Sequence, residues 1–177
     1  MNLKKLHIVT VLLLGALLIN SSGCLPRRGD HILESWETSN ERIRVRIRQY
    51  DEKAFLGLPG YYYSFEVSDK DHADQWREVA TIRTDDNVGI PREQVRFINA
   101  RTAYFFMGQI YAVTLDGGNV WSVWDGAKDR EFDGFVKDVR IAPEGTGLMT
   151  FYPIPPNSGK QPPDLFTNDY GQHWKSK

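Results

Sequence analysis

The chain has 177 residues, of which 41% are hydrophobic, 12% aromatic and 25% charged, and its formal net charge is −1 at pH 7. This length and apolar content suffice for one domain with a buried core and leave too little chain for two large domains. A nucleic-acid-binding domain is expected to be strongly basic, so the charge balance argues against nucleic-acid partners.

Residues 1–23 have the organisation of a cleaved secretory signal peptide. Lys4 and Lys5 precede an apolar run from Ile8 to Ile19, and small residues follow up to Gly23. The apolar run has 12 residues, whereas a helix that spans a bilayer needs about 20. Cleavage is therefore favoured over a permanent transmembrane anchor, and loss of the two lysines takes the net charge from −1 to −3.

Cys24 is the single cysteine of the sequence and follows this segment directly. It cannot form a disulfide within the chain, and an unpaired thiol in an exported protein is open to oxidation. The sequence SSGC resembles the lipobox of bacterial lipoproteins, which implies lipidation of the cysteine and a lipidated tether over residues 24–30. Ordinary secretory cleavage after Gly23 is the alternative, because Ser21 stands where leucine is usual. By the same resemblance, Leu25 favours sorting to the outer membrane, facing the periplasm.

Residues 31–177 are predicted to form a single β-rich domain. The segment RIRVRIR, residues 42–48, alternates apolar and charged side chains without error and is the clearest strand. PREQV, residues 91–95, is predicted to form one helical turn, and no segment carries a long helical period. Short strands separated by glycine and proline favour a sandwich, a barrel or a propeller-like array. The further predicted strands are 61–67, 95–99, 103–107, 109–113, 119–124, 136–142 and 148–152.

Two turn segments share one residue pattern. TLDGGNVW (114–121) and TNDYGQHW (167–174) place threonine, aspartate, glycine and tryptophan at the same four offsets. Glycine supplies the positive φ of a hairpin loop, aspartate and threonine accept or donate local hydrogen bonds, and tryptophan covers the turn. We therefore expect a structural role for Thr114, Asp116, Gly118, Trp121, Thr167, Asp169, Gly171 and Trp174.

This pattern resembles the Asp-box, or BNR, motif of sialidases and other β-propellers. A degenerate third copy without the glycine lies at DKDHADQW, residues 69–76, and the three tryptophans are 45 and 53 residues apart. These intervals are close to the period of a four-stranded propeller blade. The resemblance implies about three Asp-box β-sheet repeats in a partial propeller-like or sandwich arrangement. Since only three residues follow Trp174, one hypothesis is that the 42–48 strand completes the last sheet.

The sequence carries no motif of a known catalytic centre. It has no G-x-S-x-G elbow, no H-E-x-x-H, no phosphate-binding loop and no cysteine pair. Three repeats are also too few for the closed ring that a sialidase active site requires. We therefore expect a binding protein without cofactor or metal, not an enzyme.

Two surface features are candidate contacts for a partner. The arginines of the 42–48 strand share one face, either as a solvated face that pairs with neighbouring acids or as a cationic patch for an acidic partner. Alternation in the 61–67 strand directs one tyrosine away from the core. The candidate residues are Arg42, Arg44, Arg46, Arg48 and Tyr62.

A small exported lipoprotein with a few Asp-box repeats resembles the immunity lipoproteins that protect bacteria against lipase effectors of type VI secretion. That resemblance implies a periplasmic protein, tethered to the membrane by its lipid, that binds and neutralises a cognate phospholipase by protein contact. Two alternatives stay open. One is an envelope assembly or scaffold lipoprotein with a propeller-like binding surface, and the other is a carbohydrate-binding module.

Overall fold

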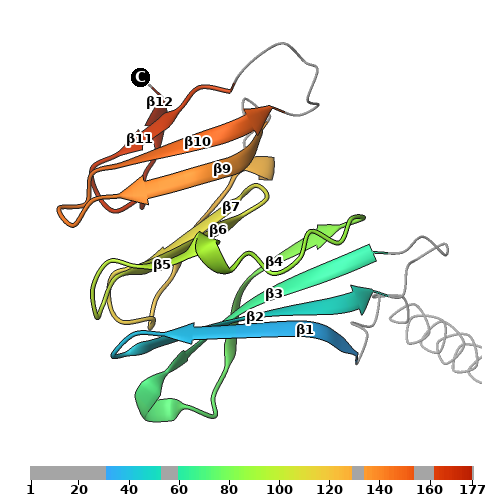
Figure 1. Ribbon diagram of the computed structural model, residues 1–177. Coiled ribbons are helices and arrows are strands. Elements are labelled where there is room, and N and C mark those ends of the chain that lie inside the picture. Colours follow the sequence, from blue (N-terminus) through green and yellow to red (C-terminus); the bar gives the residue numbers. More distant parts are fainter. Residues whose placement is uncertain (1–30, 53–59, 129–133, 154–161, 177) are drawn as a thin grey trace, which may run out of the picture.

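The structure is all-β, which confirms the fold class predicted from the sequence. The computed structural model describes residues 31–52, 60–128, 134–153 and 162–176. The predicted signal peptide, Cys24 and the tether lie outside the described residues. The described strands form three four-stranded antiparallel sheets, each made of strands that are consecutive in the chain, and the sheets are stacked as layers (Figure 1).

The strand order within each sheet follows the chain. Sheet 1 contains β1 (Ile32–Ser39), β2 (Ile43–Glu52), β3 (Gly60–Asp69) and β4 (Arg77–Thr84). Sheet 2 contains β5 (Val95–Phe97), β6 (Ala103–Met107), β7 (Ile110–Thr114) and β8 (Ser122–Asp125). Sheet 3 contains β9 (Gly134–Ile141), β10 (Gly147–Pro153), β11 (Leu165–Thr167) and β12 (Lys175–Ser176). Three short 3₁₀ turns accompany them: η2 (Lys70–His72), η3 (Arg92–Gln94) and η4 (Gly126–Lys128).

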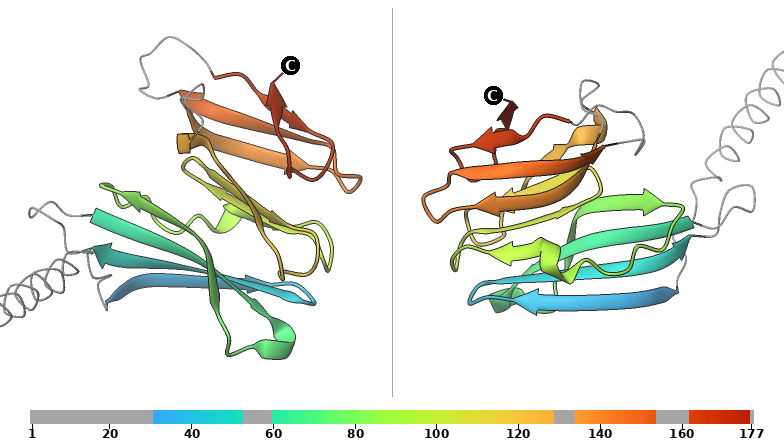
Figure 2. Two further views of the ribbon diagram at one scale, coloured as in Figure 1. Left: turned by 180° about the vertical axis from the view of Figure 1, so that it is seen from behind. Right: turned by 45° about the horizontal axis from the view of Figure 1, so that its top comes forward.

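Sheet 2 lies between the other two sheets and buries both of its faces (Figure 2). Toward sheet 1, Phe105 stacks on Phe65 with 4.5 Å between ring centroids. Toward sheet 3, Tyr104, Phe106 and Tyr111 pack with residues such as Met149 and Phe151. Burial on both faces explains why the sequence of β6, AYFFM, is an unbroken apolar run. Burial of each large side chain of this kind stabilises the folded state by about 1.5–3 kcal/mol.

The alternation in β2 places its apolar residues as expected. Ile43, Val45 and Ile47 are fully buried against sheet 2, and the arginines between them point away from that core. The hypothesis that this strand completes sheet 3 is wrong, because β2 pairs with β1 and β3. Sheet 3 is completed by β12, whose Lys175 and Ser176 pair with β11.

The turns 69–76, 114–121 and 167–174 each connect the third and fourth strands of a sheet. They therefore lie at the same end of the stack, which we call the turn end. Arg77 joins two of these turns there, since its Nη2 donates to the carbonyl oxygens of Gly118 at 2.7 Å and Asn119 at 2.9 Å. The β6–β7 turn and the end of β4, where the link from sheet 1 to sheet 2 begins, lie at the opposite end (Figure 1).

Candidate functional site

The 114–121 turn is closed by hydrogen bonds from its own residues. Thr114 Oγ1 donates to Asp116 Oδ1 at 2.9 Å and accepts from Gly118 N at 3.0 Å. The carboxylate of Asp116 also accepts from Val120 N at 3.0 Å. Partial burial opposes ionisation of Asp116, but these donors outweigh it and lower the pKa of the carboxyl group. The aspartate is thus engaged inside its loop.

The 167–174 turn repeats this geometry at the same offsets. Thr167 Oγ1 donates to Asp169 at 2.7 Å and accepts from Gly171 N at 2.9 Å, and His173 N donates to Asp169 at 3.1 Å. The His173 ring adds a 2.7 Å contact to the same carboxylate. Burial opposes ionisation, yet the donors from Thr167 and His173 prevail and lower the pKa of Asp169 to about 2.

Gly171 is required by both backbone and space. Its φ is +85°, in the left-handed region that favours glycine. A Cβ atom at this position would collide with the hydroxyl group of Tyr111, which in turn donates to the carbonyl oxygen of Tyr170 at 2.7 Å. The turn is therefore locked onto sheet 2 and is part of the scaffold.

Each turn tryptophan packs toward the sheet that precedes its own. Trp121 of sheet 2 is half-buried in the core shared with sheet 1, and its ring lies 5.4 Å from Phe105. Trp174 of sheet 3 packs edge-on against Tyr111 of sheet 2 at 5.2 Å. Trp76 holds the same position in sheet 1, and no sheet precedes it within the described chain. Its ring is instead covered by Arg46 and Arg44, whose Cζ atoms lie 3.9 and 4.9 Å from the ring centroid.

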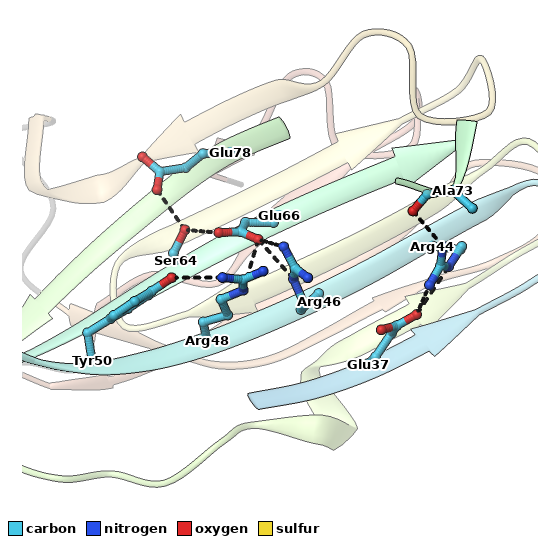
Figure 3. A network of polar contacts seen from close by, with 9 residues as sticks. All are labelled: Glu37, Arg44, Arg46, Arg48, Tyr50, Ser64, Glu66, Ala73 and Glu78. Carbon is cyan, nitrogen blue, oxygen red and sulfur yellow. Dashed lines mark hydrogen bonds and ion pairs between the residues drawn. The ribbon is translucent and has the colours of Figure 1, made fainter. Parts of the chain in front are cut away.

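The predicted arginine face forms a network of ion pairs on the outer side of sheet 1 (Figure 3). Arg46 and Arg48 both pair with Glu66, Arg46 through Nε at 2.9 Å and Arg48 through Nε at 3.2 Å. Ser64 Oγ lies between two carboxylates, 3.2 Å from Glu66 and 2.6 Å from Glu78. Three of the four arginines thus have acidic partners, because Arg44 pairs with Glu37. Arg42 is exposed beside the 114–121 turn.

Tyr62 lies on this same face but is not an exposed contact. Only 8% of the residue is accessible, because Arg83 stacks over its ring at 5.8 Å and Tyr50 packs against it edge-on at 6.1 Å. Its hydroxyl group lies 3.4 Å from Glu78. Tyr62 therefore points away from the core as predicted, but neighbouring side chains of the same face cover its ring, so it is not an exposed contact for a partner.

A groove of about 640 Å³ lies toward the end of the stack opposite the turns. Its walls come from the end of β4, the link between sheets 1 and 2, the β6–β7 turn and the starts of η4 and β9. The apolar lining residues are Ile82, Val88, Ile90, Met107, Ile110 and Phe135. Val88 and Phe135 keep 59% and 47% of their surface exposed. This volume falls within the range of ligand-binding sites.

Acidic side chains line this groove beside the apolar ones. Asp86, Glu93 and Asp125 are among its lining residues, and Arg83 is the one basic residue in that set. Asp125 already pairs with Lys128 at 3.2 Å. Within the described chain, Asp86 and Glu93 have no ion-pair partner.

Gln94 lines the groove, but its Oε1 atom is buried and has no hydrogen-bond donor among the described residues. A buried acceptor without a donor costs about 1–3 kcal/mol. Because this oxygen is not accessible from the groove, it belongs to the interior of the fold. The surface of the groove therefore combines apolar walls with two unpaired carboxylates.

Sequence reasoning missed the groove because no local pattern encodes it. Its residues come from four separate segments that meet only when the sheets stack. The one local signal is DDNVGIP, residues 85–91, where apolar residues stand within a polar turn. Among the described residues, histidine, cysteine and acidic side chains do not gather into a metal-binding group, and no described helix is long and apolar enough to cross a membrane.

The class defined by this architecture is an open stack of three four-stranded antiparallel sheets with a groove at one end. Comparison with known proteins found no family model, curated protein or solved structure that matches the chain.

Proposed function

We propose that this chain is a lipid-tethered protein of the bacterial envelope that binds and neutralises a type VI secretion lipase by protein contact. The observation that carries the protein-binding part of this proposal is the groove. Val88 and Phe135 are exposed at its borders, the isoleucine walls are partly buried, and charged residues stand beside them, a composition typical of a contact surface. The export signal, Cys24 and the Asp-box resemblance support the narrower proposal of an immunity lipoprotein.

Most of the other candidate residues, though not Arg42, are engaged within the chain. Asp116 and Asp169 hold their own turns closed, and Arg44, Arg46 and Arg48 pair with acidic residues. Groups that already satisfy one another have less to gain from a partner, because breaking an existing pair offsets much of the new contact. Among the described residues, the groove combines exposed apolar side chains with unpaired carboxylates, so it is where we propose that the lipase binds.

A substitution at the rim of the groove tests this proposal. Val88→Glu introduces a charge into the exposed apolar contact, and we expect the Kd for the lipase encoded beside this gene to rise at least tenfold in calorimetry. Val120→Glu is the matched control, since Val120 is 66% exposed in the 114–121 turn at the other end. That control should bind like the unaltered protein.

The same partnership predicts a genetic result. Deletion of the gene should be lethal only when the lipase is active, because only then is there a toxin to neutralise. A membrane defect in cells without the lipase would favour the assembly-factor alternative instead. Absence of any complex between the purified proteins would refute the immunity proposal.

A further inference from the structure

The charge around the groove restricts what it can bind. Asp86 and Glu93 are exposed, line the groove and carry no ion pair within the described chain. Asp125 pairs with Lys128, and Arg83 is the one basic residue of the lining, so its acidic residues outnumber its basic residue by three to one. The groove thus presents unpaired negative charge, and an acidic occupant would be repelled from it.

The walls add a requirement for apolar contact. Ile82, Ile90 and Ile110 line the groove as partly buried side chains, with Val88 and Phe135 more exposed at its borders. Covering apolar surface of this kind contributes about 25 cal/mol per Å². A hydrated cation without an apolar body would leave these walls in water, so charge alone does not describe the ligand.

The two features together describe one kind of protein segment. Basic side chains supply both positive charge and hydrogen-bond donors to carboxylates. Large apolar side chains cover the apolar walls. Apolar walls beside unpaired carboxylates are therefore complementary to a segment that carries both.

We infer that the groove binds a segment of a protein partner in which a lysine or arginine stands next to large apolar side chains. This inference rests on the proposed protein-binding function and gives the chemistry of the partner at that site. The basic group lies against Asp86 and Glu93, and the neighbouring apolar side chains cover the isoleucine walls. Long-range attraction between the opposite charges also speeds association at low salt.

Three synthetic peptides of equal length test the chemistry. They alternate leucine with arginine, leucine with glutamate, and serine with arginine, and they are titrated into the full chain carrying Cys24→Ser. We expect the leucine–arginine peptide to bind at least tenfold more tightly than either other peptide. Its binding should shift the side-chain amide signals of Gln94 and Gln109 in NMR spectra, because both residues line the groove.

A pair of charge-neutral variants tests the site. Asp86→Asn with Glu93→Gln should weaken binding of the leucine–arginine peptide at least tenfold and reduce its salt dependence. Glu41→Gln with Asp74→Asn is the matched control, because it removes the same charge from exposed carboxylates outside the groove. Circular dichroism checks that each variant is folded.

Three results would overturn the inference: equal binding of the leucine–arginine and leucine–glutamate peptides, an equal loss of peptide binding in both double variants, or amide shifts confined to the turn end.

Failure of this inference is distinguishable from failure of the proposed function. If the lipase binds and Val88→Glu prevents binding while the Asp86 and Glu93 variant binds normally, the basic-segment inference is wrong and the protein-binding function stands. If the peptide binds in the groove but no lipase does, the immunity proposal is wrong.

Discussion

Asp116 and Asp169 show how one carboxylate closes a turn. Each carboxylate accepts one hydrogen bond from the hydroxyl group of the threonine two residues before it. It accepts another from the backbone N–H of the residue four positions after it. The ionised form is the better acceptor, so folding favours ionisation and both pKa values are lowered. An acid placed in this way stabilises the turn whenever it carries its charge.

The pH dependence of stability follows for Asp169. Its pKa of about 2 in the folded protein lies below the ordinary value of 3.8, so its contribution is present above pH 4 and is lost as the pH falls toward 2. Asp169→Asn should therefore cost about 1 kcal/mol of unfolding free energy at pH 6, allowing for the partial exposure of the side chain. The difference from the unaltered protein should shrink between pH 4 and pH 3 in urea titrations.

The control for this prediction is Asp164→Asn, which removes an exposed carboxylate just before β11. Its effect on the unfolding free energy should stay below about 0.5 kcal/mol. A loss for Asp169→Asn that is the same at pH 6 and pH 3 would show that the charge of this carboxylate does not stabilise the turn.

At the scale of elements, the outer face of sheet 1 acts as the end cap of the stack. The two neighbouring sheets cover the aromatic side chains on both faces of sheet 2. On the outer face of sheet 1, Arg44 and Arg46 cover the ring of Trp76 instead. Terminal repeats of stacked proteins need such a polar outer face to remain soluble. The alternation of β2 therefore directs its apolar side chains into the core and its arginines onto the charged outer face.

Glu66 is the centre of this cap, and its removal should be costly. It is 8% exposed and neutralises both Arg46 and Arg48. Glu66→Gln leaves two partly buried guanidinium groups without their counter-ion, and we expect it to cost about 2–3 kcal/mol of unfolding free energy. Glu37→Gln removes one side of an exposed pair and should cost less than about 1 kcal/mol.

Urea unfolding of the two variants measures this difference. Equal costs for Glu66→Gln and Glu37→Gln would mean that burial of the network adds nothing to the stability of sheet 1. A difference of at least about 1 kcal/mol is the expected outcome, since Glu66 pairs with two arginines and Glu37 with one.

β1 and β4 were not predicted from the sequence, for physical reasons. β1 is an edge strand whose Ile32 and Leu33 are both about half exposed, at 40% and 43%, so its residues do not alternate clearly. β4 pairs with β3 across a register shift between Phe65 and Glu66, and a bulge of this kind interrupts the two-residue period. By contrast, β2 pairs with β3 without a register shift, and its pairing with β1 shifts only beyond residues 42–48, so this segment was predicted from its alternation alone.

At the scale of the whole molecule, stacking of the sheets determines what the sequence cannot show. The turns were recognisable because all their residues lie within eight consecutive positions. The groove could not be recognised in the sequence, because its lining residues belong to different elements and are brought together only by packing. Examples are Ile82, Gln94, Ile110 and Phe135. Local motifs thus predicted the scaffold, and the tertiary arrangement produced the candidate binding surface.

The proposed lipid tether is tested at Cys24. If the SSGC sequence acts as a lipobox, Cys24→Ser removes the lipid and should move the protein from the membrane fraction to the soluble periplasmic fraction. Several acyl chains anchor a protein stably, whereas one chain binds a membrane only marginally, so the redistribution should be nearly complete. Ser21→Leu, which brings the lipobox closer to its usual form, should keep the protein in membranes and is the matched control. A Cys24→Ser protein that still sediments with membranes, in cell fractions checked by immunoblotting, would contradict lipid anchoring, because the thiol would then be dispensable.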